Sequence, residues 1–381
     1  MTTVCFATPG VYPMLNGIGS YGGSELRAWR LARDLAGRSI CRVSMLAFDY
    51  GQSQVLARDG IEFIRDSSNV YARGVLAKLR WWAHTFAYRE TLSGTPLLHE
   101  QEYAIWDAAS ADVYIAFGAT GYSARLARWC QIRRRRFVLM HGSDMDLDPI
   151  EIDAAYVYAF PGLSVAQTKY QARELGNRFG RESMVLPNPV DIPERAPCSA
   201  PREFALWVGK SDRVKCPDRM LGLAHLCSNV PILMIMNRAN PEIFDAIKAD
   251  APKNVTFIDA VPPDAMHSYY RRAFAFVSTS KIEGFANSFL EAGACGTPIL
   301  SLDVDPEGML SHHGAGLLTL GRLDVAATAL NEWYSVRDWI PGSKGRNLGE
   351  NAFRYVVAHH AQVNIFDRFA AIVKAELDRA Y

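Results

Sequence analysis

Four absences limit the classes of protein to which this 381-residue chain can belong. The formal net charge is only +1, so no global field attracts nucleic acid or an acidic membrane, and such a partner would need a local patch. Seven cysteines occur without a C-x-x-C pair, which fits buried thiols in a reducing cytoplasm better than a zinc or disulfide framework. No apolar run approaches the ~20 residues that span a bilayer. The first residues, MTTVCFATPG, also lack the basic region and apolar core of a signal peptide. We therefore expect a soluble cytosolic protein with no nucleic-acid partner.

The length and the order of apolar segments indicate two α/β domains. A single core seldom grows beyond ~250 to 300 residues, so 381 residues favour two cores with a cleft between them. Short apolar runs alternate with amphipathic segments in both halves, as in doubly wound parallel sheets. At the start we expect a strand over 3–8, a loop over 9–23, and a helix over 24–36 that Ser24 caps. The Pro- and Ala-rich stretch that ends near Pro201 reads as an interdomain linker.

Residues 283–298 read EGFANSFLEAGACGTP and form the segment with the most chemical content. They follow an apolar run over 273–277 that suits a buried parallel strand. Glu283 and Gly284 stand at the carboxyl end of that strand, and Glu291 comes eight residues after Glu283. A helix that begins near Ala286 would turn Glu291 back toward the strand end, since eight residues make just over two turns. Two carboxylates would then border one cleft.

This string resembles the E-x7-E signature of the retaining family 4 glycosyltransferases of GT-B fold. The resemblance implies that Glu283, with the amides of Gly284 and Phe285, meets the donor sugar, and that Glu291 holds the ribose of the nucleotide. Read without the resemblance, both acids are ordinary exposed glutamates. The resemblance implies two Rossmann-like domains that face each other across a cleft, and a C-terminal helix that crosses back to the first. We place an acceptor-side domain at 1–190, a linker at 191–202, a donor-nucleotide domain at 203–355 and the returning helix at 356–381.

A glycine-rich loop follows the first predicted strand. Gly17, Gly19 and Gly22 spell a literal G-x-G-x-x-G, and Asp49 closes the next strand where a ribose-binding acid of a dehydrogenase would lie. However, these glycines begin about nine residues after the strand, whereas the dinucleotide fingerprint requires a tight strand-to-helix turn. The longer string GIGSYGGSE resembles the family's glycine loop, which contacts the donor diphosphate through backbone amides. We therefore assign donor binding to Gly22 and Gly23 and keep an NAD-dependent dehydrogenase as an alternative.

A histidine and three aspartates follow another predicted strand, over 136–140. His141 stands at its carboxyl end, where α/β folds place ligand groups, and matches the histidine that the family directs at the donor sugar. An isolated histidine is otherwise a core or surface residue. Asp144, Asp146 and Asp148 spell D-x-D-x-D, which raises a metal hypothesis. Alternating aspartates after a strand are more often turn and cap residues, and the family generally needs no metal, so we predict none.

Two lysines at the start of the second domain are candidate catalytic cations. Lys210 and Lys215 lie in GKSDRVKCPD, which is similar to the family's G-R-x-x-x-x-K-G with Lys in place of Arg. Cations beside a cleft offset the charge of a departing diphosphate, although Lys lacks the bidentate fork of Arg. Val261 occupies the loop where relatives hold the nucleobase through backbone. The crossover PNPVD departs from the family's P-N-G-V-D, and Pro189 cannot adopt the positive φ of that glycine.

Aromatic and basic residues of the first domain raise the question of the acceptor. Trp81 and Trp82 lie among Lys78, Arg80 and Arg89 in a predicted helix over 74–92, and four arginines occupy 133–136. These residues suit core packing and a solvated face, but also contact with anionic lipid. We therefore predict transient peripheral membrane contact and a glycan or lipid-linked acceptor.

The combined expectation is a retaining, metal-independent transfer from a nucleotide-diphosphate sugar, UDP- or GDP-linked, to an acceptor hydroxyl in glycan or envelope polysaccharide biosynthesis. His141, Lys210, Lys215 and Glu283 would be catalytic, and no cofactor would be needed beyond the donor. Two alternatives remain besides the dehydrogenase: an epimerase or hydrolase of the same fold, and a nonenzymatic protein that binds nucleotide sugars.

Overall fold

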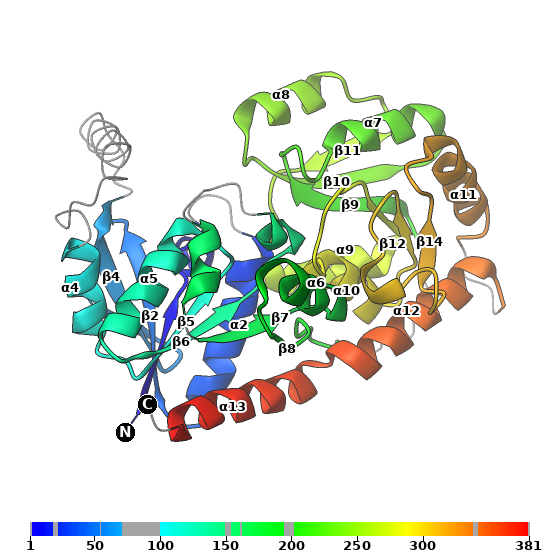
Figure 1. The fold of residues 1–381 in the computed structure, drawn as a ribbon. Coiled ribbons are helices and arrows are strands. Elements are labelled where there is room, and N and C mark those ends of the chain that lie inside the picture. The colour runs from blue at the N-terminus through cyan, green and yellow to red at the C-terminus, as the bar shows by residue number, and fades with distance from the viewer. Residues whose placement is uncertain are drawn as a thin grey trace.

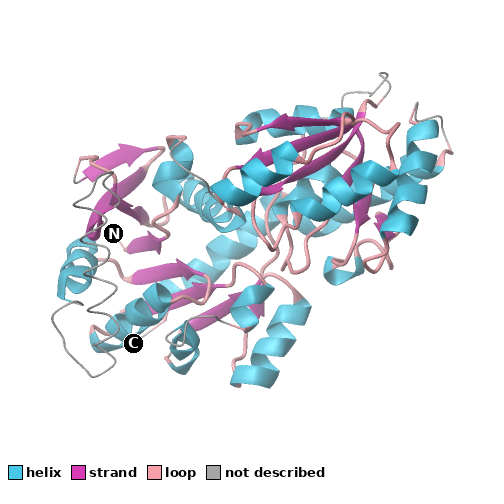
Figure 2. Cartoon of the chain, turned by 90° about the horizontal axis from the view of Figure 1, so that it is seen from above, coloured by secondary structure: helices cyan, strands magenta, loops and turns pink. Residues whose placement is uncertain are grey.

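The computed structural model describes residues 2–17, 22–53, 55–70, 100–148, 154–160, 162–193, 202–337 and 342–379. The predicted helix over 74–92, with Trp81 and Trp82, therefore lies outside the described residues, as does most of the predicted linker. Figure 1 and Figure 2 show two groups of strands, each with its own helices. In Figure 1, helices α12 and α13 follow one another along the lower side of the two groups.

The first sheet has eight strands in the order β3-β4-β2-β1-β5-β6-β7-β8. Their bounds are β1 Thr3–Ala7, β2 Arg42–Asp49, β3 Val55–Arg58, β4 Ile61–Val70, β5 Val113–Phe117, β6 Arg136–Met140, β7 Leu163–Ala166 and β8 Met184–Val185. All neighbouring strands are parallel except β3, which pairs antiparallel with β4 at the edge. From β4 to β7 this is the doubly wound order, whose switch point lies between β1 and β5.

Helices cover both faces of this sheet, so its strands are apolar on both sides. The helical segments are α1 Val11–Leu15, α2 Gly23–Gly37, α4 Glu100–Ala109, α5 Gly121–Ile132, α6 Lys169–Phe179 and two 3-10 turns, η3 Asp144–Leu147 and η4 Ala154–Ala159. One core contains Trp29 and Leu35 of α2, and the other contains Trp106 of α4 and Trp129 of α5, whose rings meet edge to face.

The second sheet has six parallel strands in the order β11-β10-β9-β12-β13-β14, again the doubly wound order. Its strands are β9 Phe204–Lys210, β10 Ile232–Asn237, β11 Val255–Ile258, β12 Ala273–Ser278, β13 Ile299–Ser301 and β14 Gly316–Leu318. Its helical segments are α7 Pro217–Leu226, α8 Pro241–Ala249, η5 Pro263–Ala265, α9 Met266–Arg272, α10 Asn287–Ala294, η6 Pro306–Gly308 and α11 Leu323–Ser335. The predicted pair of doubly wound domains is thus confirmed.

The chain crosses between the domains twice, and the two crossings lie side by side. Val190, after β8, forms a parallel bridge with Ala361, which separates α12 (Lys344–His360) from α13 (Gln362–Asp378). The His360 Nδ1 atom lies 3.0 Å from the carbonyl oxygen of Asn188. Helix α13 then contributes Phe369 and Val373 to the core beneath the first sheet (Figure 1). The expected return of the C-terminal helix is confirmed.

Two local expectations were wrong. The segment predicted as a loop over 9–23 contains the short helix α1, in which Val11 and Met14 are buried against the sheet. Ser24 does not cap α2, because the helix begins one residue earlier, at Gly23. The Glu25 carboxylate takes the capping role instead: its Oε2 accepts a hydrogen bond from the Gly22 N–H at 2.8 Å.

Candidate functional site

A cleft of about 470 Å³ lies between the two domains and is lined by residues from both. It lies where the carboxyl ends of several strands of the two sheets come together, the place where doubly wound folds bind ligands. Nine of the ten predicted site residues line it: Gly22, Gly23, Lys210, Lys215, Val261, Glu283, Gly284, Phe285 and Glu291. Residues far apart in the sequence therefore meet in one cavity.

Lys210 lies at one of the points where the two domains approach each other in this cleft. It is the last residue of β9, and a Cβ atom on Gly22 would lie 3.2 Å from its Nζ. The amine of the second domain thus lies against the glycine loop of the first. An amine beside a glycine backbone suits a phosphate group, and here the Gly22 N–H itself donates to Glu25 Oε2.

Lys215 and Glu283 form an ion pair inside the cleft. The turn that carries Lys215 is held by Asp212, whose Oδ1 accepts its backbone N–H at 2.8 Å. Cys216 follows with a φ of 47°, in the left-handed region where the family motif has glycine. Both charged side chains are largely shielded from solvent, so each partner limits where the other points.

Glu291 lies on α10 and lines the cleft, as predicted, and its carboxylate also reaches toward the first domain. Its Oε1 atom lies 3.7 Å from the guanidinium of Arg30, on α2. Burial raises the pKa of Glu291, and this effect is opposed by the Arg30 charge and the Tyr270 hydroxyl. A buried carboxylate beside one cation retains lone pairs for ligand hydroxyls, which suits the predicted ribose contact.

Apolar side chains form the end of the cleft near the predicted nucleobase loop. Val208 of β9 and Ile235 of β10 line it together with Val261 and Met266. A flat aromatic group would lose water on both faces there, as small-molecule sites require.

The loop at 283–285 is held by side chains from the first domain. The Phe285 N–H donates to Gln167 Oε1 at 2.9 Å, and the Phe285 carbonyl accepts from Asn188 Nδ2 at 2.8 Å. A Cβ on Gly284 would lie 2.5 Å from Gln167 Oε1. Only glycine allows this backbone to lie so close to the Gln167 side chain.

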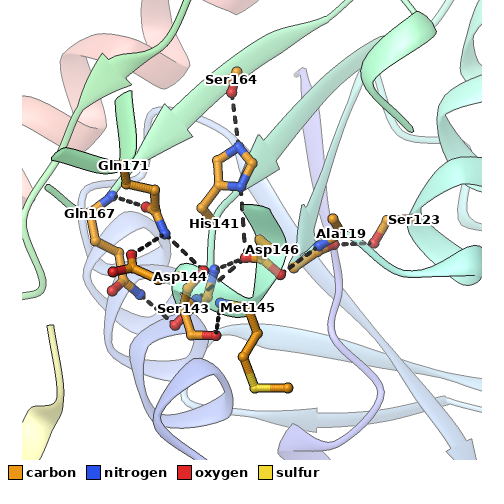
Figure 3. Close-up of polar contacts among 12 residues, drawn as sticks. Ala119, Ser123, His141, Ser143, Asp144, Met145, Asp146, Ser164, Gln167 and Gln171 are labelled. Atoms are coloured by element: carbon orange, nitrogen blue, oxygen red, sulfur yellow. Dashed lines mark hydrogen bonds and ion pairs between the residues drawn. The ribbon is translucent and has the colours of Figure 1, made fainter. Parts of the chain in front are cut away.

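His141 is placed differently from the other predicted residues. Its ring is fully buried and does not line the cleft, although the next two residues do. Nε2 lies 3.0 Å from Ser164 Oγ and Nδ1 lies 3.7 Å from Asp146 Oδ2, as Figure 3 shows. The ring stacks on Tyr158, and the His141 carbonyl accepts a 3.0 Å hydrogen bond from the buried Arg27. In this arrangement His141 anchors the start of a cleft-lining loop.

The three aspartates of the D-x-D-x-D string point to three different partners. Asp146 is buried and accepts from the Gly142 and Ala119 N–H groups at 2.7 and 3.0 Å. Burial opposes its ionisation, but His141 and these amides keep its pKa below the ordinary value. Asp148 is exposed and pairs with Arg178, whereas Asp144 lies near Gln171. Within the described residues no three His, Cys, Asp or Glu side chains come together as a metal site.

The described arginines of the 133–136 run contact the chain itself. Arg133 pairs with Asp107 at 2.8 Å, Arg135 lies 3.6 Å from Asp112, and Arg136 donates to the carbonyl of Arg379. Among the described residues, no helix is both long enough and apolar enough to pass through a bilayer.

Comparison with known proteins identifies the second domain. Residues 199–353 match the family described as Glycosyl transferases group 1. The chain carries a group 1 glycosyltransferase domain. Glu283, Glu291 and both cleft lysines lie within the matched residues.

Relatives and solved structures extend the similarity beyond that domain. The chain is 28% identical to D-inositol 3-phosphate glycosyltransferases of Rhodococcus jostii, over 204 residues, and of Nocardia farcinica, over 199 residues. Each match covers 45% of this chain and 44% of the relative, so the chain spans less than half the length of these relatives. Sucrose-phosphate synthase of Thermosynechococcus elongatus superposes with a TM-score of 0.75 at 15% identity, covering 98% of this chain and 99% of the other. HepE of Anabaena in complex with UDP superposes with a TM-score of 0.70 at 16% identity, covering 98% of this chain and 100% of the other. The chain has the GT-B fold of these structures.

Sequence reasoning missed the residues through which the first domain reaches the glycosyltransferase domain. Gln167 and Asn188 hold Phe285, and Arg30 pairs with Glu291. Gln167 directly follows β7, the same signal that singled out His141, so it could have been found. Nothing in the sequence marks Arg30, since it is one of many cations on an amphipathic helix.

Proposed function

We propose that this protein is a retaining family 4 glycosyltransferase, which moves a sugar from a nucleotide-diphosphate donor to an acceptor hydroxyl without a metal ion. The observation that carries the proposal is the convergence, in one interdomain cleft, of two lysines, the glycine loop and both acids of the E-x7-E string. The group 1 match of the second domain supports it.

Each cleft region fits one part of the donor. The diphosphate would lie between the glycine loop at Gly22 and Gly23 and the two lysines, which line the same cleft. The ribose would bind Glu291, and the nucleobase would enter the apolar end near Val261. The sugar would then lie against Glu283 and the Gly284 N–H. Because HepE binds UDP and the curated relatives are named for an inositol phosphate, a uridine nucleotide and a polyol or glycan acceptor are the first candidates.

The chemistry we propose is front-side attack. As the bond between the anomeric carbon and the phosphate oxygen breaks, the diphosphate leaves with the electron pair. The acceptor oxygen forms its bond on the same face, and its proton passes to the departing phosphate. Lys210 and Lys215 would stabilise the growing phosphate charge in a site that largely excludes water, where fixed charges act most strongly. Glu283 orients Lys215 through their ion pair.

The experiment begins with donor identity. Thermal shifts against UDP, GDP, ADP and CMP sugars should single out one nucleotide, since a ligand at 100 times its Kd stabilises by ~2.7 kcal/mol. The product anomer, read by NMR, should match the donor, and chelation should leave turnover unchanged. Products formed without any acceptor would instead indicate a hydrolase or an epimerase.

Lys215→Ala tests the role of the cleft cation. We expect turnover to fall by ~100-fold or more, because the developing phosphate charge loses its partner. Lys253→Ala is the matched control, since Lys253 is exposed in the turn before β11. Near-normal turnover of Lys215→Ala would remove this lysine from the mechanism.

A further inference from the structure

One glutamine side chain joins the loop at 283–285 to the loop at 141–144. Gln167 is 3% exposed and stands directly after β7. Its Oε1 accepts the Phe285 N–H of the second domain at 2.9 Å, and its Nε2 donates to the Gly142 carbonyl of the first at 2.8 Å. Gln167 Oε1 can only accept a hydrogen bond and its Nε2 group can only donate one, so these two partners fix which way the side-chain amide points.

The contact is tight on both sides. A Cβ on Gly284 would lie 2.5 Å from Gln167 Oε1 and 3.2 Å from Ser143 Cα. The backbone of one loop therefore lies almost directly on the backbone of the other. A shift of either loop would break the hydrogen bond or create a clash, so the two loops must move together.

A second glutamine braces the first. Gln171, on α6, is fully buried; its Oε1 accepts the Gln167 N–H at 2.8 Å and its Nε2 donates to the Ser143 carbonyl at 2.9 Å. Figure 3 shows both glutamines beside Ser143 and Asp144. Gln171 bonds only within the first domain, whereas Gln167 reaches across the cleft.

We infer that Gln167 is a positioning residue that couples the donor-sugar loop, residues 283–285, to the acceptor-side loop, residues 141–144. The inference rests on the proposed function for the substrates that the two loops meet. With the Phe285 N–H engaged by Gln167, the Glu283 and Gly284 N–H groups of this loop make no hydrogen bond within the described residues. The loop that meets the donor sugar and the loop on the acceptor side are thus positioned together, in one arrangement of the two domains.

Three variants separate this role from general stability. Gln167→Met removes both hydrogen bonds at nearly constant volume. Gln167→Glu keeps the shape, but its carboxylate cannot donate to the Gly142 carbonyl, whereas its protonated form can. Gln171→Met is the matched control, because it removes buried bonds at the neighbouring position and leaves the cross-domain bond in place.

Hydrogen exchange at the Phe285 amide tests the coupling without any substrate. In the unliganded protein, Gln167→Met should speed exchange there by about 10-fold or more, since the amide loses its acceptor. Gln171→Met should change it by less than about threefold. Equal exchange in the wild type and in Gln167→Met would overturn the inference, whatever reaction the protein catalyses.

Kinetic measurements then test whether the coupling of the two loops contributes to glycosyl transfer. For Gln167→Met, kcat should fall about 10-fold or more while the Kd for UDP, or for the nucleotide found by thermal shift, stays within about threefold. Gln167→Glu should regain activity relative to the wild type as the pH falls and the glutamic acid becomes protonated, whereas Gln167→Met should not. A Gln167→Glu variant with wild-type kcat at every pH would overturn the inference. If the exchange result holds but the wild type turns over no nucleotide sugar, the proposed function fails and the coupling of the loops stands.

Discussion

At the scale of single residues, Asp144 is a partly buried carboxyl group in the stretch that follows the cleft-lining Ser143. Burial raises its pKa to about 7, and the nearby carboxylates of Asp146, Glu283 and Glu307 act in the same direction. Its one hydrogen bond among the described residues is a long contact of 3.4 Å from Gln171 Nε2. The carboxyl group is therefore held partly protonated at neutral pH by its surroundings.

This pKa predicts how stability varies with pH. Since the folded value lies above the ordinary 3.8, the native state holds a proton that the unfolded state releases between about pH 4 and 7. The destabilising effect of Asp144 is therefore absent below about pH 4, grows between about pH 4 and 7, and levels off above pH 7. Near pH 4, the melting temperature of Asp144→Asn should equal that of the wild type. At pH 8, the substitution should raise the melting temperature of the first domain by about 2–4 °C, equivalent to ~1 kcal/mol.

Scanning calorimetry at both pH values measures this difference. Asp148→Asn is the control, because Asp148 belongs to the same string but is exposed beside Arg178. If Asp144→Asn raised the melting temperature equally at pH 4 and pH 8, the charge of Asp144 would not be the cause of the increase.

At the scale of elements, helix α13 belongs to the core of the first domain although it follows the second in the chain. Phe369 is 1% exposed and packs on Phe6 of β1 at a ring-centroid distance of 6.1 Å. Arg38, the residue that caps the C-terminal end of α2, also pairs with Asp367 of α13 at 2.8 Å. The first sheet is therefore incompletely covered until the last residues of the chain return.

Phe369→Ala should destabilise the first domain by about 3–4 kcal/mol, because a buried aromatic side chain is lost and a cavity remains. Val363→Ala, on the same helix but 65% exposed, should cost less than ~0.5 kcal/mol. Urea unfolding followed by tryptophan fluorescence compares the two variants. A cost below ~1 kcal/mol for Phe369→Ala would mean that α13 contributes little to this core.

At the scale of the whole molecule, the acceptor and any membrane contact stay predictions. The tryptophans of the 74–92 segment lie outside the described residues, and Arg133 and Arg135 are partly neutralised by Asp107 and Asp112. We expect the protein to sediment with anionic vesicles at low salt and to lose this binding at high salt, since such attraction is screened. Absence of binding at low salt, or equal binding to neutral vesicles, would favour a soluble acceptor.

Within the site, the sequence alone indicated the residues whose chemistry depends on local spacing. Glu283 lies in the loop after β12 and Glu291 lies about one turn into α10, so both border one cleft. Lys210 ends β9 and Lys215 follows it, and both line the same cleft. The two doubly wound sheets could also be predicted, because alternating strands and helices leave few other topologies.

Only the tertiary structure decided which groups of the first domain complete that cleft. Gln167, Asn188 and Arg30 contact residues about 100 or more positions away, and no periodicity in a sequence records such a separation. The burial of the His141 ring was likewise undetermined, since a residue at a strand end can turn toward a ligand or into the core. Spacing along one element is set by backbone geometry, whereas contacts between elements are set by how two separately folded cores dock.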